Sequence, residues 1–344
     1  MIRHTYLSLA GNMIIHLKES INQKTAEEMA VKTDSICLKK GSKFVLINSN
    51  KIQAIESEFE SAVEESFNFE SDTQLASRLY HSNTIQMEVA EKTIGGISQN
   101  TMVITGPCSV ESRKQIESCA DFVSGIGISV LRAGCFKPRT SPYTFQGMGL
   151  EGLKLLSEVR EKYGLKIISE ARDASHIDKV IEHVDIVQVG AKAMYDQGVL
   201  RKCGKAEKPI LLKRSFGATL QEFIQAAEFI LCGGNENVIL CERGIRTFET
   251  KTRFTLDLCG VAYLKEHVNL PVFLDPSHAM GYAYGVADLT RACVAMGVDG
   301  LLIESHPYPK TALSDASQQL NFKEFETLYD SIGAIATAVG RNIV

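Results

Sequence analysis

Four residues of the chain carry donor atoms that suit a divalent metal ion. They are one cysteine, one histidine and two acidic residues: Cys108, His278, Glu304 and Asp315. A thiolate, an imidazole and carboxylates together suit a borderline ion. A lone cysteine is more often a packed core thiol, so the metal interpretation depends on the other three residues lying nearby. The remaining cysteines are expected to pack in the core: Cys37, Cys119, Cys135, Cys203, Cys232, Cys241, Cys259 and Cys293.

Six basic residues form a second group: Arg132, Lys137, Arg139, Lys192, Lys213 and Arg243. If they lie together, they repel one another unless anions bind between them. Phosphate and carboxylate groups are the natural ligands, because arginine binds them with two hydrogen bonds and lysine supplies a compact charge. Lys213 stands inside an apolar run, where burying an unpaired ammonium is costly. A functional partner for Lys213 is therefore favoured over a place on the surface.

From about residue 100 onward, short apolar runs alternate eight times with amphipathic helical patterns. Each run is nearly continuously apolar, as expected for a parallel strand covered on both faces. The predicted strands are 102–106, 130–135, 166–171, 185–191, 209–215, 238–243, 271–278 and 300–306. Helices are predicted between them, one with a capping box at Thr219 and Glu222 and one in the segment after Arg246.

This alternation predicts an α/β fold, namely a (β/α)8 TIM barrel. The alternative is a doubly wound open sheet, but no glycine-rich dinucleotide-binding motif follows any of the runs. In a TIM barrel the active site lies at the carboxyl ends of the strands. The metal-binding candidates and the basic residues stand at or just after those ends, so the sequence predicts one site that combines a metal ion with bound anions.

Residues 1–85 show a different pattern. Strands are predicted at 13–18, 35–40, 42–49 and 66–71, and helices at 25–32 and 56–65. The order β-α-β-β-α-β predicts a small ferredoxin-like α+β domain. We expect residues 86–100 to form a linker and residues 101–344 to form the catalytic barrel.

The composition is that of an ordinary globular protein. Of 344 residues, 44% are hydrophobic and 23% are charged, which excludes wholesale disorder. A net charge of −4 gives no electrostatic reason to expect a nucleic-acid or membrane partner. The amino-terminal segment lacks the uninterrupted apolar core of a signal peptide. Nine scattered cysteines fit a reducing compartment, so a cytoplasmic location is expected.

Six motifs, in order along the chain, resemble those of one enzyme family. They are GPCSVES (106–112), KPRTSPYTFQG (137–147), LLKRSF (211–216), ILCERGIRTFE (239–249), DPSH (275–278) and the pair Glu304 and Asp315. This family is 3-deoxy-D-arabino-heptulosonate 7-phosphate (DAHP) synthase, which opens the shikimate pathway of aromatic amino acid biosynthesis. The likeness is greatest to the shorter bacterial and archaeal branch, in which a ferredoxin-like domain precedes the barrel.

The resemblance implies a transferase that condenses phosphoenolpyruvate (PEP) with erythrose 4-phosphate and releases phosphate. Family metal ligands fall on Cys108, His278, Glu304 and Asp315, with Mn2+ as the expected ion and Fe2+, Zn2+ or Co2+ as alternatives. Family PEP-binding residues fall on Arg132, Lys137, Lys213 and Arg243. The loop that binds the aldose phosphate falls on Arg139, Thr140 and Ser141.

The implied chemistry assigns roles to several of these residues. Cys108 and His278 hold the metal, which polarises the aldehyde. Lys137 donates a proton to the new hydroxyl, and Glu170 orients the attacking water. Lys192 is a departure, because the family commonly has arginine at this PEP-binding position and lysine loses the two-pronged geometry.

Three other functions remain alternatives. The related 3-deoxy-D-manno-octulosonate 8-phosphate (KDO 8-phosphate) synthases use arabinose 5-phosphate, but they usually carry alanine and asparagine where this chain has Pro138 and Arg139. A class I aldolase would use Lys213 as a Schiff base. A catalytically silent barrel would only sense metabolites.

The same resemblance implies that the amino-terminal domain binds an aromatic amino acid effector, tyrosine or phenylalanine, between subunits. The alternative is a domain that serves only oligomerisation or solubility. A homotetramer or homodimer is expected, without a nucleic-acid or membrane partner.

Overall fold

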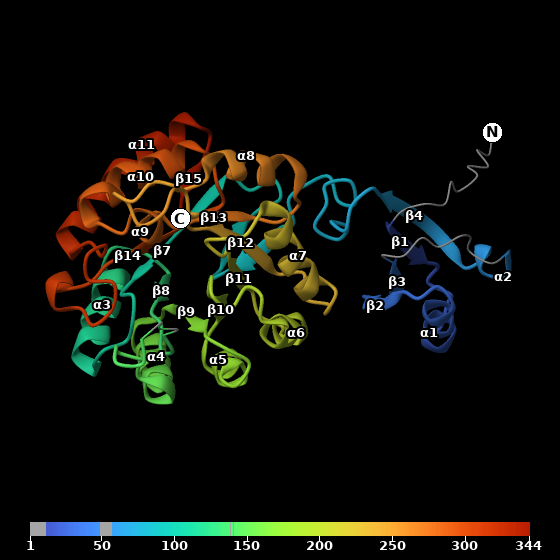
Figure 1. The fold of residues 1–344 in the computed structure, drawn as a ribbon, viewed down its shortest axis with the longest axis horizontal. Helices are drawn as coiled ribbons and strands as arrows, with labels where there is room; N and C mark the ends of the chain where they lie inside the picture. Colours follow the sequence, from blue (N-terminus) through green and yellow to red (C-terminus); the bar gives the residue numbers. More distant parts are fainter. Residues whose placement is uncertain (1–11, 49–56, 138, 140) are drawn as a thin grey trace.

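The computed structural model describes residues 12–48, 57–137, 139 and 141–344. A barrel ringed by helices forms most of the molecule, and a small domain formed by the amino-terminal residues lies to one side of it (Figure 1). No helix among the described residues is long and apolar enough to cross a membrane.

Eight parallel strands of the described chain close into the barrel. They are β7 (Asn100–Gly106), β8 (Val130–Arg132), β9 (Lys166–Ala171), β10 (Ile186–Val189), β11 (Ile210–Lys213), β12 (Val238–Glu242), β13 (Val272–Leu274) and β14 (Gly300–Glu304). Closure comes from β14 pairing with β7, with Glu304 opposite Gly106. The predicted TIM barrel is confirmed, and the open doubly wound sheet is excluded.

Helices cover the outside of the barrel. They are α3 (Arg113–Gly125), α4 (Gly149–Tyr163), α5 (Ile177–His183), α6 (Gln197–Lys205), α7 (Leu220–Leu231), α8 (Leu258–His267), α10 (Ala283–Ala295) and α11 (Phe322–Ala338). The capping box of Thr219 and Glu222 begins α7 as predicted. The helix predicted after Arg246 begins only at Leu258 of α8, because the segment first forms a loop closed by a bridge between Ile245 and Thr255.

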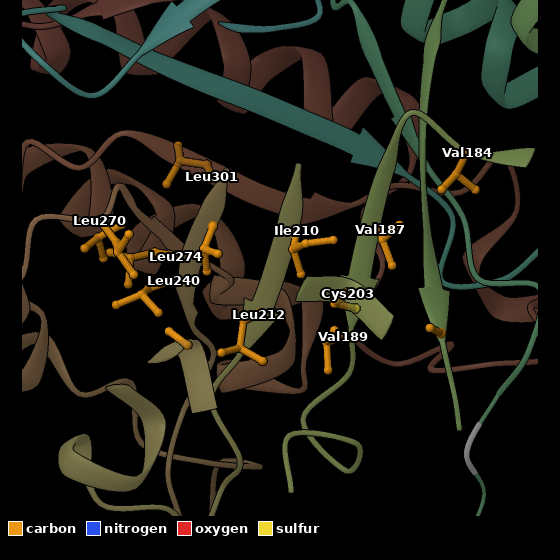
Figure 2. Packing of buried hydrophobic residues seen from close by; sticks show 14 of the residues in the cluster. Val184, Val187, Val189, Cys203, Ile210, Leu212, Leu240, Leu270, Leu274 and Leu301 are labelled. Atoms are coloured by element: carbon orange, nitrogen blue, oxygen red, sulfur yellow. The ribbon is translucent and has the colours of Figure 1, made fainter. Parts of the chain in front are cut away.

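Strand alternation separates two layers of apolar side chains. Ile210 and Leu212 of β11 lie in the outer cluster, between strands and helices, where Figure 2 shows them beside Val187 and Val189 of β10. Leu211, between them, belongs to a second cluster inside the barrel. The same alternation directs the next residue of β11, Lys213, toward the inside.

A short hairpin closes the amino-terminal end of the barrel. It consists of β5 (Met87–Val89) and β6 (Lys92–Ile94), whose Met87, Val89 and Ile94 join the inner cluster. A last short strand, β15 (Asn342–Ile343), pairs with the beginning of β7. The inner apolar cluster therefore fills the amino-terminal part of the barrel and leaves the carboxyl end for polar residues.

The small domain is an antiparallel sheet of order β2-β3-β1-β4, the ferredoxin-like order. Its elements are β1 (Asn12–Leu17), α1 (Gln23–Lys32), β2 (Ile36–Lys40), β3 (Lys43–Asn48), α2 (Ser57–Glu60) and β4 (Val63–Phe69). The helix predicted over 56–65 is wrong beyond Glu60, because Val63 and Glu65 pair with β1. Residue 56 lies outside the described residues.

The small domain docks on the barrel through the segment after β4. Ile14 and Val45, on the sheet face away from α1, belong to the main apolar cluster together with Leu75 and Ala76. The buried Glu228 of α7 accepts hydrogen bonds from three successive backbone N–H groups, those of residues 74–76, at 2.7, 3.2 and 2.9 Å. The junction is therefore built from apolar packing and one buried carboxylate.

Candidate active site at the carboxyl end of the barrel

The inward face of the strands carries charged side chains at its carboxyl end. Each such position lies two residues after an inner-cluster residue, as strand alternation requires: Arg132 after Val130, Glu170 after Ile168, Lys213 after Leu211, Arg243 after Cys241, Asp275 after Phe273 and Glu304 after Leu302. All six are buried. A barrel with an apolar floor therefore ends in a compact layer of charges.

The four metal-binding candidates meet in this layer. Donor atoms of Cys108, His278, Glu304 and Asp315 all lie within 4.8 Å of one another. His278 Nε2 is 3.5 Å from both Glu304 Oε1 and Asp315 Oδ2, and Cys108 Sγ is 3.6 Å from the same Asp315 oxygen. Two ligands that share a tetrahedral ion at about 2.1 Å are roughly 3.4 Å apart. The spacing and the donor types fit a divalent metal ion.

His278 is positioned by a helix cap rather than by a strand. The run predicted as a strand over 271–278 ends at Leu274, and Asp275 then caps the short helix α9 (Pro276–Met280) by accepting from the His278 backbone N–H at 2.9 Å. Asp275 Oδ2 lies 2.8 Å from His278 Nδ1. One carboxylate thus caps the helix that carries the histidine and lies beside its Nδ1, while Nε2 lies toward the cluster.

Asp315 reaches the cluster from the loop that follows β14. A bridge between Ser305 and Leu320 closes the base of this loop. Asp315 adopts a φ of 50°, a left-handed conformation that is uncommon outside glycine. Gln319 accepts from the Cys108 backbone N–H at 2.9 Å and donates to the Ser314 carbonyl at 2.8 Å. The loop is therefore tied to the segment that carries Cys108.

A cavity of about 370 Å³ opens beside the cluster and contains most of the basic group. Its lining includes Lys137, Arg139, Ser141, Lys192, Lys213 and Arg243, together with His278 and Asp315. Arg243 is buried, yet its Nε and Nη1 have no hydrogen-bond partner among the described residues. Burial lowers the pKa of Arg243. A guanidinium in this state is a strong candidate to bind an anionic ligand.

Other members of the basic group are paired with site residues. Lys213 Nζ lies 2.5 Å from Asp275 Oδ2, and Arg132 donates to Glu304. Arg132 therefore stands behind a metal-binding candidate and does not line the cavity. Burial alone would raise the pKa of Glu304, but His278 and Arg132 hold it below its usual value.

Lys137 lies between the cluster and Glu170. Its Nζ donates to the Cys108 carbonyl at 3.1 Å and is 3.8 Å from Glu170 Oε2. Burial alone would lower the pKa of Lys137, but Cys108 and Glu170 raise it. The side chain is thus kept protonated beside the cavity.

Thr140 lies outside the described residues. Its neighbours Arg139 and Ser141 line the cavity, and Arg139 also contacts Ser314 in the loop that carries Asp315.

Three site residues were not given a role by sequence reasoning. Asp275 is part of the DPSH motif, but its contacts with both Lys213 and His278 depend on the fold. Arg253 enters the cavity from the loop that was predicted to be helical. Gln318 contacts both Glu304 and Asp315, and no pattern in the sequence distinguishes this glutamine from others.

Comparisons with known proteins agree on one family. The model of the DAHP synthetase I family matches residues 84–339. A phospho-2-dehydro-3-deoxyheptonate aldolase of Thermotoga maritima is 43% identical over 267 residues, covering 78% of this chain and 78% of that protein. The crystal structure of a Thermotoga maritima DAHP synthase covers 97% of this chain and 100% of its own, with a TM-score of 0.79 and 37% identity.

A second group of relatives is more distant. A 2-dehydro-3-deoxyphosphooctonate aldolase of Syntrophotalea carbinolica is 30% identical over 274 residues, covering 74% of this chain and 98% of that protein. Of these two relatives, the heptonate enzyme has the higher identity to this chain. By its sequence, its barrel and its match to the family model, this chain belongs to the DAHP synthetase I family.

Proposed function

We propose that the chain condenses PEP with erythrose 4-phosphate to give DAHP and phosphate, the first step of the shikimate pathway. The observation that carries this proposal is that the lining of one cavity combines basic residues with two members of the metal-binding cluster. Two phosphorylated substrates need cations to bind them, and the aldehyde needs a Lewis acid beside it to polarise its oxygen. Membership of the DAHP synthetase I family supports the same reaction.

PEP binding is assigned to the buried basic residues that line the cavity. Arg243 offers guanidinium donors that no described residue accepts, and Lys137 and Lys213 add two ammonium groups. Together they suit the carboxylate and phosphate of PEP, and Arg132 supports the site from behind through Glu304. Lys192 lines the same cavity and supplies charge where the family commonly has arginine. Arg139, Thr140 and Ser141 are proposed to bind the phosphate of the aldose.

Cys108, His278, Glu304 and Asp315 would hold the metal ion, for which Mn2+ is our first candidate and Fe2+, Zn2+ and Co2+ are alternatives. When bound, the ion supplies Lewis-acid polarisation of the aldehyde oxygen. The protein positions the C3 carbon of PEP against the aldehyde carbon, which is the larger part of what a binding site contributes to a condensation of two substrates.

Two residues are assigned to proton and water handling. Lys137, held protonated by Cys108 and Glu170, donates a proton to the oxygen of the former aldehyde as the new carbon–carbon bond forms. Water then adds at C2 of the former PEP, oriented by Glu170, and phosphate leaves. Lys137→Met should therefore lower kcat strongly, and normal turnover in this variant would contradict the assignment.

The direct test is product formation with two aldoses. Phosphate release and product mass should be measured with PEP plus either erythrose 4-phosphate or arabinose 5-phosphate. We expect a much larger kcat/KM with the four-carbon sugar. A preference for arabinose 5-phosphate would support KDO 8-phosphate synthesis, and no release with either would support a silent barrel. Trapping by borohydride would instead indicate a Schiff base on Lys213, whose Nζ is paired with Asp275.

The amino-terminal domain is proposed to be regulatory. We assign residues 1–85 to this domain, 86–100 to the connection and 101–344 to the catalytic barrel, in a homotetramer or homodimer. Tyrosine or phenylalanine is the proposed effector. A variant without residues 1–85 should keep turnover and lose inhibition by both amino acids. Full inhibition of the truncated protein would contradict the regulatory assignment.

A further inference from the structure

Gln318 is a buried amide that contacts two of the four metal-binding candidates. Its side chain is 1% exposed, although it belongs to the loop between β14 and α11. Nε2 donates to Glu304 Oε2 at 2.6 Å and lies 3.4 Å from Asp315 Oδ2. Oε1 accepts from Arg253 Nη1 at 2.7 Å. Each end of the amide therefore has a charged neighbour.

The chemistry of these neighbours fixes the orientation of the amide. Ionised carboxylates only accept hydrogen bonds, so the NH2 group must face Glu304 and Asp315. A guanidinium only donates, so the amide oxygen must face Arg253. Rotating the amide by half a turn would place its oxygen against two carboxylates and its NH2 group against a cation. Arg253 therefore holds Gln318 in the one orientation that serves both acidic side chains.

Gln318 and His278 contact different carboxylate oxygens of Glu304. Its bond engages Oε2, while Oε1 lies 3.5 Å from His278 Nε2 and also accepts from Arg132. With both oxygens held, the carboxylate has little freedom to rotate. A ligand that is held before the metal arrives loses less conformational freedom on binding it.

We propose that Gln318 is a positioning residue for the metal site, orienting Glu304 and Asp315, and that Arg253 acts through it. The inference rests on the proposed metal-dependent function and deepens it. Arg253 comes from the loop between β12 and α8 and lines the cavity, so it connects the substrate side of the site with the metal-binding side.

Two neighbouring residues of the same loop show what a merely structural role looks like. Gln319 bonds only to backbone groups, those of Cys108 and Ser314. Ser317 donates to the Gly281 carbonyl at 2.9 Å, and within the described part of the chain no hydrogen bond joins its side chain to a metal-binding candidate. Ser317→Ala is therefore a matched control for disturbance of the loop.

The test measures metal binding directly, apart from catalysis. Metal-free full-length protein is titrated with Mn2+ by calorimetry, in the wild type, Gln318→Met and Ser317→Ala. Methionine keeps the length of the side chain and removes the donor. We expect Gln318→Met to raise the Kd for Mn2+ about 10–100-fold, the usual cost of removing a group that orients a ligand. Ser317→Ala should stay within about twofold of the wild type, because the bond that it loses touches no ligand.

Two further readouts separate positioning from a general loss of structure. With Co2+, the band from the Cys108 thiolate should persist in Gln318→Met while the ligand-field bands change. At saturating Mn2+, kcat should fall and the KM for PEP should stay within about twofold, because Gln318 does not line the cavity. An unchanged Kd in a folded Gln318→Met variant would overturn the inference. Absence of Mn2+ binding by the wild type would instead overturn the proposed metal site.

If Gln318→Met does not fold, Arg253→Met decides, since the Arg253 side chain is 39% exposed. Arg253 Nη1 also lies 3.3 Å from Asp315 Oδ2, so removing its charge alone should strengthen binding of a cation. Releasing the Gln318 amide should weaken it. A higher Kd for Mn2+ than in the wild type supports the inference, and an equal or lower Kd overturns it.

Discussion

Both ends of the barrel bury charged side chains, but they differ in how many hydrogen-bond partners those side chains have. At the carboxyl end, Arg243 keeps guanidinium N–H groups for which the described residues offer no acceptor. At the amino-terminal side, where the small domain docks, the carboxylate of Glu228 accepts from three backbone N–H groups. The orphaned polar atoms there are neutral amide oxygens, those of Gln74 and Asn269. Both regions bury charge, but of the two it is the carboxyl end where a described charged side chain keeps donors without acceptors.

The difference separates function from structure. A charge whose partners all come from the chain contributes to folding, whereas a charge with unused donors or acceptors is costly until a ligand arrives. Substitutions at the carboxyl end should therefore change activity with little effect on stability. Substitutions at the docking end should do the reverse.

The largest effect is expected from the four metal-binding candidates. Cys108→Ala removes one of four donors and should lower kcat/KM by about three orders of magnitude, because Lewis-acid stabilisation of several kcal/mol is lost. Phosphate release with both substrates measures the effect. The melting temperature of the metal-free variant should stay close to that of the metal-free wild type. Retention of Mn2+-dependent activity would remove Cys108 from the site.

Arg243→Met should give the next largest effect. The variant loses charge-assisted hydrogen bonds worth about 1.5–3 kcal/mol, so the KM for PEP should rise about 10–150-fold. Relief of the unsatisfied guanidinium should leave the metal-free, ligand-free protein equally or more stable. Initial rates and thermal unfolding provide the two readouts. An unchanged KM for PEP would mean that the orphaned guanidinium binds something else.

Glu228→Ala tests the opposite end. The change leaves three backbone N–H groups without their acceptor and should destabilise the junction by about 2–3 kcal/mol at pH 8. Hydrogen exchange of the Leu75 and Ala76 amides should speed up accordingly. At a temperature where the variant stays folded, kcat/KM should remain within about twofold of the wild type. A large loss of activity without faster exchange would contradict the proposed division between the two ends.

The stability of this junction should also depend on pH. Burial raises the pKa of Glu228 to about 7, against the opposing hydrogen bonds from the backbone of residues 74–76. The folded state thus binds a proton more tightly than the unfolded state, whose carboxyl has an ordinary pKa near 4.3. The resulting stabilisation is fully present below that ordinary pKa and is lost as the pH rises through about 7.

The difference in hydrogen-exchange protection between the wild type and Glu228→Ala should therefore be smaller at pH 8 than at pH 5, by at most about 3 kcal/mol. A difference that grows with pH would show that the hydrogen bonds outweigh burial.

The fold was predictable because the barrel repeats a local pattern. Continuous apolar runs such as 209–215 identify parallel strands, and their carboxyl ends meet by topology alone. The predicted helices that differ from the structure lie where tertiary contacts outweigh local preference. Val63 and Glu65 look helical in sequence but pair with β1, and the loop after Arg246 carries a helical pattern without forming a helix before Leu258.

The residues of the candidate site could be predicted from the sequence, but many of the contacts between them could not. The residue types of Cys108, His278 and Glu304 indicate metal binding, and all three lie at the carboxyl end of the barrel. The roles of Asp275, Arg253 and Gln318 arise from contacts between segments far apart in the chain. A glutamine or a loop arginine has no distinctive local signal, so its role appears only once the partners are in place.

A crystal structure of the protein with Mn2+ and PEP is the most direct test of the proposed catalytic centre. We predict an anomalous scattering peak between Cys108, His278, Glu304 and Asp315, with the PEP phosphate or carboxylate bound to Arg243 in the same cavity. A metal peak elsewhere, or PEP bound away from Arg243, would contradict the assignment of this end of the barrel as the catalytic centre.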